Sequence, residues 1–471
     1  MRREDSLKRN AIIMEIGTIL SKGFSILIMP FFSRWLSPEE YGNFDVVATY
    51  ASLCLPLATF ALSEAIFRFL IEAKDAKEEK KIASTSCAMV LCGFTVVGVV
   101  LYILLSSTSL SDIRYAFLVY FFADIVNNIT LYYVRGTKKT VLYTVSSSFN
   151  MPFLFLFVFI FVKKLELGCN GMLIGYASAL LCCSLIGFVG SKMYQSLSIK
   201  AIEFSYAKTL LKYSIPMIPN SISWWILNAS DRSIINIFVG ASANGIYAMA
   251  YKIPTFCTTL VNTFHYSWVE NISTHINDSD RDQYIRKVFN NYASTILSIC
   301  IGITSVSYLL FRFFIDDAYI TACLYAPILA ASVFFSATSM FIGGVFVAFK
   351  DSKENGFSTV FSAVINIIIH LSLVSLIGLY AAAVSTLASY AILLVLRMYR
   401  LRKKYHIALK FDRRTGMLAL AYCYFIFAQY IISIPLHLIN VMLACIVVLL
   451  VNKSLVLSTI RDLKKAIINK R

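Results

Sequence analysis

The sequence predicts an all-α polytopic membrane protein with about 14 transmembrane helices, each of roughly 20 mainly apolar residues. The chain has 471 residues, of which 58% are hydrophobic and only 15% charged, and its mean hydropathy is +0.71. A soluble domain is usually closer to a quarter charged. Long apolar runs recur from residue 11 almost to the C-terminus, and the connectors between them are too short to fold alone.

The expected spans follow one another along the chain. Their ranges are 11–33, 43–65, 82–105, 115–134, 140–162, 171–191, 209–231, 245–268, 288–311, 322–348, 356–377, 379–399, 415–433 and 436–452. The charged N-terminus with its apolar run looks superficially like a signal peptide. That run is too long, contains Glu15 and Lys22, and lacks a small-residue cleavage site. We therefore expect the first span to be retained.

Basic residues gather in every second connector. The chain holds 43 Lys and Arg against 26 Asp and Glu, which gives a net charge of +17. Basic stretches such as 74–81, 135–139 and 397–414 all fall on one side of the predicted spans. Because cytoplasmic loops retain Lys and Arg, this pattern predicts cytoplasmic termini and an even number of spans. It also explains the net charge without a nucleic-acid partner.

A weak internal repeat predicts the domain organisation. Residues 35–44 resemble residues 238–247, so that Gly42 matches Gly245. We expect an N-terminal lobe of six spans over 1–200 and a C-terminal lobe of six spans over 201–405. Two further helices and a cytoplasmic tail would occupy 406–471. Two lobes that enter from the same face are typical of parallel-repeat transporters, and the site is then expected in a central cavity.

Charges inside apolar runs indicate a polar interior. Glu15 and Lys22 are two helical turns apart and share one face of the first span. Lys252 lies inside the eighth span. Intramembrane charges are costly and usually face a bundle interior or a water-filled cavity. These residues form either a cationic cavity wall for an anionic ligand or a buried structural stripe.

Several carboxylates are candidates for ion coupling, namely Glu15, Asp45 and Asp124. An intramembrane carboxylate can relay protons or bind sodium, and it can equally be paired with a lysine. Glu64 and Arg68, four residues apart, are expected to form a helical ion pair.

Other polar residues could contact a substrate. Arg232 and Arg34 lie on the predicted outer side, where Arg232 is either an entrance charge or a helix-end anchor. Tyr251 and Asn228 could bind a sugar or simply join helices. The residues expected to bind substrate in the cavity are Lys22, Lys252, Arg232, Arg34, Tyr251 and Asn228.

No motif indicates catalysis or a cofactor. There is no Walker A sequence, so no nucleotide on this chain can power transport. There is also no His-Glu-x-x-His or Gly-x-Ser-x-Gly pattern. The 11 cysteines lie mostly in apolar runs without metal-ligand spacing. We expect no catalytic residues, no metal and no cofactor.

Four segments resemble polysaccharide repeat-unit flippases of the Wzx type. They are residues 30–45 (PFFSRWLSPEEYGNFD), 213–220 (YSIPMIPN), 228–235 (NASDRSII) and 245–254 (GIYAMAYKIP). That family belongs, with lipid II flippases and drug exporters, to the multidrug, oligosaccharidyl-lipid and polysaccharide exporter superfamily.

The resemblance implies a flippase that moves polyprenyl-diphosphate-linked oligosaccharides of O-antigen or capsule type. The substrate would pass from the cytoplasmic to the outer leaflet of a bacterial inner membrane by alternating access. Lys22 falls where lipid II flippases carry a functional arginine, although lysine cannot clamp a phosphate bidentately. Membrane lipids are implied partners, and a polysaccharide polymerase and chain-length proteins are further candidates.

Two other functions stay open at this point. One is a cation-coupled exporter of small molecules or drugs, and the other is a membrane polysaccharide polymerase. A cavity for cationic drugs should favour acids, whereas Lys22 and Lys252 are basic. A polymerase usually needs a sizeable outer loop, and no outer connector here is long.

Overall fold

The computed structural model describes residues 23–108, 110–431 and 433–453, and every regular element in these ranges is helical. The all-α membrane fold is therefore confirmed. Nine helices in the described ranges are long and apolar enough to cross a membrane, or ten when the bent pair α3 (Pro38–Ala58) and α4 (Leu62–Glu72) counts as one. The predicted number of spans stays a prediction, because most of the first span lies outside these ranges.

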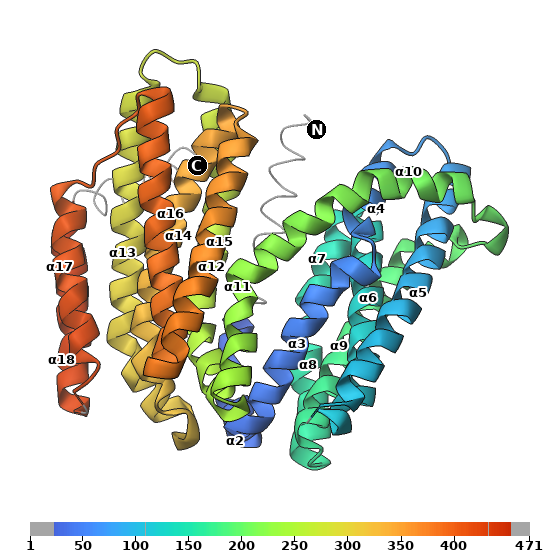
Figure 1. Cartoon of the computed structure of the whole chain (residues 1–471), viewed down its shortest axis with the longest axis horizontal. Helices are drawn as coiled ribbons and strands as arrows, with labels where there is room; N and C mark the ends of the chain where they lie inside the picture. The colour runs from blue at the N-terminus through green and yellow to red at the C-terminus, as the bar shows by residue number, and fades with distance from the viewer. Residues whose placement is uncertain (1–22, 109, 432, 454–471) are drawn as a thin grey trace, which may run out of the picture. The chain divides into compact units, whose positions relative to one another are not determined.

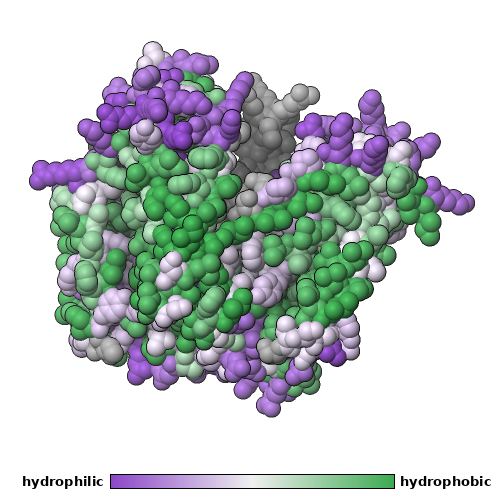
Figure 2. All heavy atoms as spheres, in the orientation of Figure 1, coloured by the Kyte–Doolittle hydropathy of each residue, from purple (hydrophilic) through white to green (hydrophobic). Residues whose placement is uncertain are grey.

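The chain folds into two compact units, Met1–Gly245 and Ile246–Arg471. The predicted lobes 1–200 and 201–405, the third segment 406–471 and the central cavity stay predictions. In each unit, apolar side chains cover the length of the visible helices and hydrophilic ones gather toward the helix ends (Figure 2). This distribution is what a hydrocarbon layer with two aqueous faces requires.

The first unit is built from helices that follow the predicted spans closely. They are α2 (Met29–Trp35), α3, α4, α5 (Ala76–Ser106), α6 (Arg114–Gly136), α7 (Thr140–Ser148), α8 (Asn150–Val158), α9 (Gly168–Ser191), α10 (Phe204–Ser214) and α11 (Ile218–Phe238). Short helical turns cover Phe159–Lys164 (η2), Met193–Ser196 (η3) and Ile199–Ala201 (η4).

Small residues let the helices of the first unit pack closely. A Cβ on Gly187 of α9 would lie 3.0 Å from the Thr130 methyl of α6, and a Cβ on Gly175 would lie 2.9 Å from Val158 of α8. Without a hydrophobic driving force inside lipid, such close packing is a main source of helix association.

The second unit contains most of α12 (Ala241–His275) and all of α13 (Arg281–Phe314), α14 (Ala322–Ala348), α15 (Ser352–Ile377), α16 (Leu379–Tyr405), α17 (Arg413–Ala428) and α18 (Ile434–Val451). The helices α13, α14 and α16 run side by side (Figure 1). In the core, the Trp268 ring stacks on Phe341 at 4.2 Å, and its Nε1 donates to the Phe341 carbonyl. Gly378, where we predict two adjoining spans to separate, ends α15 and precedes α16.

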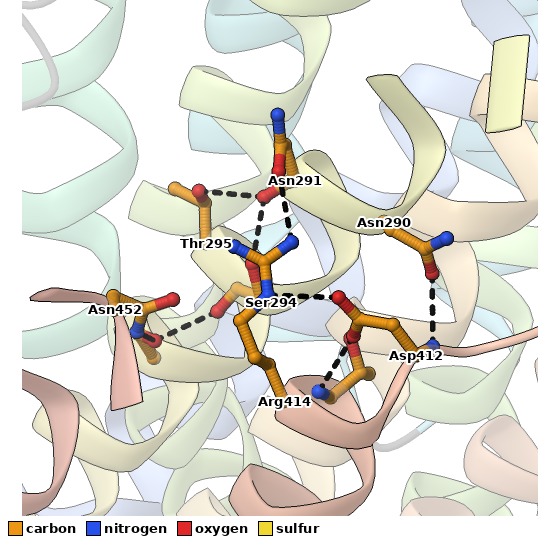
Figure 3. Close-up of polar contacts among 9 residues, drawn as sticks. Asn290, Asn291, Ser294, Thr295, Asp412, Arg414 and Asn452 are labelled. Atoms are coloured by element: carbon orange, nitrogen blue, oxygen red, sulfur yellow. Dashed lines mark hydrogen bonds and ion pairs between the residues drawn. The ribbon is translucent and has the colours of Figure 1, made fainter. Parts of the chain in front are cut away.

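The last two helices are fastened to α13 by polar contacts at one end. Asp412 caps α17 by accepting hydrogen bonds from the backbone N–H and hydroxyl of Thr415. Arg414 donates to Asp412 at 2.8 Å and to Asn291 of α13 at 3.1 Å (Figure 3). Asn452, just after α18, donates to Ser298 of α13. The pair α17–α18 is therefore an integral part of the second unit.

A buried arginine joins α14, α15 and α16. The Arg397 side chain is 4% exposed and donates to the Ser339 carbonyl at 2.7 Å, to Asn355 Oδ1 at 2.6 Å and to Thr359 Oγ1 at 2.9 Å. Its Nε donates to Ser358. All these partners are neutral. The charge pattern counts Arg397 among the basic residues of a connector, although the predicted span 379–399 includes it. In the structure the residue lies inside α16.

The Asp412 cap gives a first prediction. Burial alone raises the pKa of Asp412, yet the hydrogen bonds from Thr415 and Arg414 outweigh it and leave this pKa below its usual value. Asp412→Ala should lower the free energy of unfolding in mixed micelles by about 1–2 kcal/mol. The matched control is Asp280→Ala, since Asp280 precedes α13 without capping it through its side chain. An equal loss in both variants would contradict the capping role.

The pH dependence follows from the same carboxylate. A pKa depressed by folding stabilises the native state above the unfolded pKa of about 3.9, and this stabilisation disappears as the pH falls. The difference between wild type and Asp412→Ala should therefore shrink when unfolding is measured at acidic pH.

The Arg397 shell gives a second prediction. A Cβ on Gly343 would lie 2.8 Å from Arg397 Nη1 and 3.0 Å from Asn355 Oδ1, and the hydrogen bonds of the guanidinium prevent it from moving aside. Gly343→Ala should destabilise the protein by about 1–3 kcal/mol. Gly356→Ala is the control, because a Cβ at that position would have no neighbouring atom within 4 Å and alanine favours helix there. Thermal unfolding in detergent separates the two variants.

Candidate functional site: a charged helix crossing in the first unit

A capping box fixes the start of α3. Ser37 accepts a hydrogen bond from the Glu40 backbone N–H, and the Glu40 carboxylate accepts one from the Ser37 backbone N–H at 2.9 Å. Pro38 occupies the first helical position, where its missing N–H costs nothing. The Ser-Pro-Glu-Glu sequence therefore sets where Gly42 and Asp45 lie on the first turns of the helix.

The beginning of α3 crosses the beginning of α12 with almost no space between the backbones. A Cβ on Gly42 would lie 1.8 Å from the Ala241 carbonyl oxygen, and a Cβ on Gly245 would lie 1.9 Å from the Pro38 carbonyl oxygen. The contact is reciprocal, because each glycine faces the residue four positions before the other. Only glycine fits at either position. The two residues matched by the internal repeat therefore lie against each other.

Next to this crossing, a carboxylate of α3 meets two donors, one from α11 and one from α12. Arg232 Nε of α11 lies 3.1 Å from Asp45 Oδ2, and the two side chains are 23% and 16% exposed. Asn244, fully buried at the start of α12, donates to the Gly42 carbonyl at 3.0 Å and to Asp45 Oδ2 at 3.4 Å. We call Asp45, Arg232 and Asn244 the crossing cluster.

The crossing cluster has the chemistry of a reversible link. Both charges keep some contact with solvent, so the pair can separate without leaving a fully buried charge. A second polar contact lies further along α3, where Trp225 Nε1 of α11 donates to the Thr49 carbonyl at 2.9 Å. Together these contacts join α3 to α11 through hydrogen bonds that can form and break.

The structure places the predicted carboxylates differently. Asp45 is paired, with arginine rather than lysine. Asp124 is half-buried in α6, and within the described ranges no ion pair engages it. Tyr120, one turn earlier on α6, is buried. Asp124 therefore keeps the features expected of a carboxylate that could bind a cation, while the coupling role of either residue stays a prediction.

The predicted basic and polar residues are also spread over the described chain. Arg34 is exposed at the end of α2. Lys252 and Tyr251 are half-buried in the part of α12 that belongs to the second unit, where the Tyr251 ring packs against Tyr247. Neither Arg34 nor Lys252 forms an ion pair within the described ranges.

Other predicted residues cannot be compared in this way. Glu15 and Lys22 lie outside the described residues, and so does the side chain of Asn228. The predicted Glu64–Arg68 pair is wrong. Arg68 pairs instead with Glu72 at 3.2 Å, and Glu64 accepts a hydrogen bond from Tyr132 of α6. Glu64 and Glu72 are each one helical turn from Arg68. Because Glu64 is bound by Tyr132 of α6, Glu72 is the acid that pairs with Arg68.

The crossing cluster was not predicted as a group. Asn244 carries no signal alone, because a single asparagine at a helix start is common. The sequence feature that could have indicated the cluster is the internal repeat, which aligns the starts of α3 and α12. Sequence similarity alone does not reveal that the two matched segments are in contact.

The family model described as polysaccharide biosynthesis protein matches residues 7–269. The chain is 23% identical over 409 residues to the probable low-salt glycan biosynthesis flippase Agl15 of Haloferax volcanii, and the match covers 84% of this chain and 83% of that protein.

Two solved structures have the same fold. The lipid II flippase MurJ in an inward closed conformation matches with a TM-score of 0.73 at 16% identity, over 95% of this chain and 100% of that one. An inward-facing multidrug resistance MATE transporter of the MOP superfamily matches with a TM-score of 0.63 at 14% identity, over 83% and 98%. The resemblance carried by residues 30–45 and 245–254 is confirmed, and the chain belongs to the polysaccharide biosynthesis protein family.

Proposed function

We propose that this protein is a flippase that carries a polyprenyl-diphosphate-linked oligosaccharide repeat unit from the cytoplasmic to the outer leaflet. The crossing cluster is the observation that supports this most, because a transporter that alternates its access needs a contact that opens and closes. A sugar chain with a diphosphate cannot cross hydrocarbon unaided, since each unpaired polar group costs several kcal/mol there. O-antigen or capsule units are the substrate class that this proposal names.

In this proposal, the crossing cluster holds α3 against α11 and α12 in one state and releases them in the other. The predicted topology puts this end of the helices on the outer side. Release would hydrate Asp45 and Arg232, which already touch solvent. An anionic substrate moving outward also gains from an inside-negative potential, by about 2.3 kcal/mol per charge per 100 mV.

The basic residues that the sequence predicts for the cavity would hold the diphosphate. Lys252 is the most direct candidate, because it lies within a helix and forms no ion pair with a described residue. Arg34 and Lys22 are further candidates, and Tyr251 and Asn228 would bind sugar hydroxyls. Asp124 and Glu15 would couple an ion that resets the empty carrier, whereas Asp45 serves mainly to pair with Arg232.

A cation-coupled exporter is the second candidate. Asp124, an acid without an ion-pair partner among the described residues, and the fold shared with a multidrug transporter favour it. Transport measured in vesicles whose membrane contains the purified protein distinguishes the flippase from the exporter. A defined polyprenyl-diphosphate glycan should change leaflets at a set potential, and a cationic dye under a sodium or proton gradient should not be exported. The opposite pair of results would establish the exporter.

Lys252 gives a third prediction. Lys252→Ala should reduce glycan translocation in this assay by roughly tenfold to a hundredfold, as expected for a lost hydrogen bond to a charged group. Lys252→Arg should keep most of the rate because the charge remains. Lys163→Ala, which removes an exposed lysine from η2, serves as the control. Unchanged translocation in Lys252→Ala would remove this residue from the substrate site.

The crossing cluster gives a fourth prediction. Asp45→Arg and Arg232→Asp should each reduce translocation at least about tenfold, because each places two like charges side by side. The double variant Asp45→Arg/Arg232→Asp should restore most of the translocation rate, since it restores an ion pair of opposite charges at these two positions. The matched control is the same exchange at Arg312 and Asp317, an exposed pair 2.9 Å apart, which should have little effect.

The double exchange also tests what Arg232 does. An aspartate at position 232 would repel a diphosphate, so a restored rate assigns Arg232 to the helix link and not to the substrate. Loss of translocation in a double variant that unfolds at the wild-type temperature would instead assign Arg232 to the substrate.

A further inference from the structure

An apolar groove runs along the first unit between α5, α6 and α9. It consists of two adjoining cavities of about 150 Å³ and 470 Å³ that share Val126, Thr130 and Phe188. Leu91 of α5 and Leu185 of α9 line it and are 60% and 61% exposed. The groove therefore opens toward the side of the helices that faces lipid, and hydrocarbon rather than water would fill it.

The segment that connects α9 to α10 contributes to the lining of the groove. Met193 and Leu197 of this segment line the smaller cavity. The segment is held by hydrogen bonds, since Tyr133 of α6 donates to Ser196 and the Ser198 backbone N–H donates to Ser84 of α5. This part of the lining is thus anchored to both α5 and α6.

The same segment exposes apolar and basic side chains together. Ile199 is 88% exposed and Phe204 is 91% exposed, which is costly unless these side chains enter the interfacial layer of a membrane. Between and before them lie Lys192 and Lys200, both exposed and without an ion-pair partner in the described ranges. The acid of the segment, Glu203, is already paired with Lys81 at 2.5 Å.

From the groove and its basic rim we infer a binding site for one anionic phospholipid of the cytoplasmic leaflet. One acyl chain lies in the groove against Leu91, Val126, Leu185 and Phe188. The headgroup phosphate is bound by Lys192 and Lys200, and Ile199 and Phe204 insert beside it. Charge complementarity selects an anionic headgroup, as in other basic sites between helices at the cytoplasmic face. The site goes beyond the proposed transport and needs no glycan.

Binding to the purified full chain in detergent tests the inference. Native mass spectrometry would compare dioleoylphosphatidylglycerol with dioleoylphosphatidylcholine, which have identical chains and differ in headgroup charge. The wild type should retain the phosphatidylglycerol preferentially. Replacing Lys192 and Lys200 together with alanine should reduce this preference at least about tenfold. The control pair Lys163→Ala and Lys164→Ala removes the same charge from η2 and should leave it unchanged.

A second pair of variants tests the groove. Leu185→Trp should fill it and weaken the binding of both lipids, whereas Leu104→Trp, at an exposed position of α5 outside the groove, should not. Equal retention of both lipids by the wild type would overturn the inference. So would displacement of phosphatidylglycerol by substoichiometric undecaprenyl monophosphate, because the groove would then belong to the carrier lipid. The comparison of these lipids on the wild-type protein tests the inference even if a variant does not fold.

Discussion

A charged side chain buried between apolar helices must be compensated by the protein itself, and this constraint shapes both units. The chain meets it in two ways. Asp45 and Arg232 compensate each other and keep some solvent contact, so their link can break at moderate cost. Arg397 is instead surrounded by neutral carbonyl, amide and hydroxyl oxygens and is almost fully buried. Displacing this guanidinium would break all of these hydrogen bonds together.

The two solutions suit different mechanical roles. In the second unit, the Arg397 shell joins three helices, and the cluster around Asp412 and Asn291 adds α17 to α13. Both arrangements join helices within the second unit by several hydrogen bonds each. In the first unit, the glycine crossing and the Asp45 pair lie where α3 meets α11 and the beginning of α12. The site of proposed movement is therefore the site with the weaker compensation.

Much of the fold could be predicted from hydropathy, because a helix that crosses hydrocarbon needs a long apolar run. Even the separation of α15 from α16 at Gly378 was visible, since only a glycine interrupts the run there. The charge of Arg397 was counted with the connector because its neighbours are basic, and the neutral atoms that hold it come from α14 and α15. Sequence proximity carries no information about such partners.

The candidate site was less predictable for the same reason. Arg232 and Asp45 were each recognised as charges in or near spans, but their pairing joins residues far apart in the chain. The helical pair expected for Glu64 and Arg68 failed because Glu72 offered the same spacing and Tyr132 bound Glu64. Spacing along one helix gives possible contacts, and packing against another helix selects among them.

The glycine crossing has a consequence for the energy of any motion at this point. Neither Gly42 nor Gly245 has a side chain that must change rotamer when the helices part. What crosses the contact is dispersion and the hydrogen bond from Asn244 Nδ2 to the Gly42 carbonyl. A gap of about 0.5–1 Å already removes a quarter to a half of the dispersion, and a typical hydrogen bond contributes about 0.5–1.5 kcal/mol net. Opening at this point therefore costs a small number of short-range contacts, and closure restores all of them.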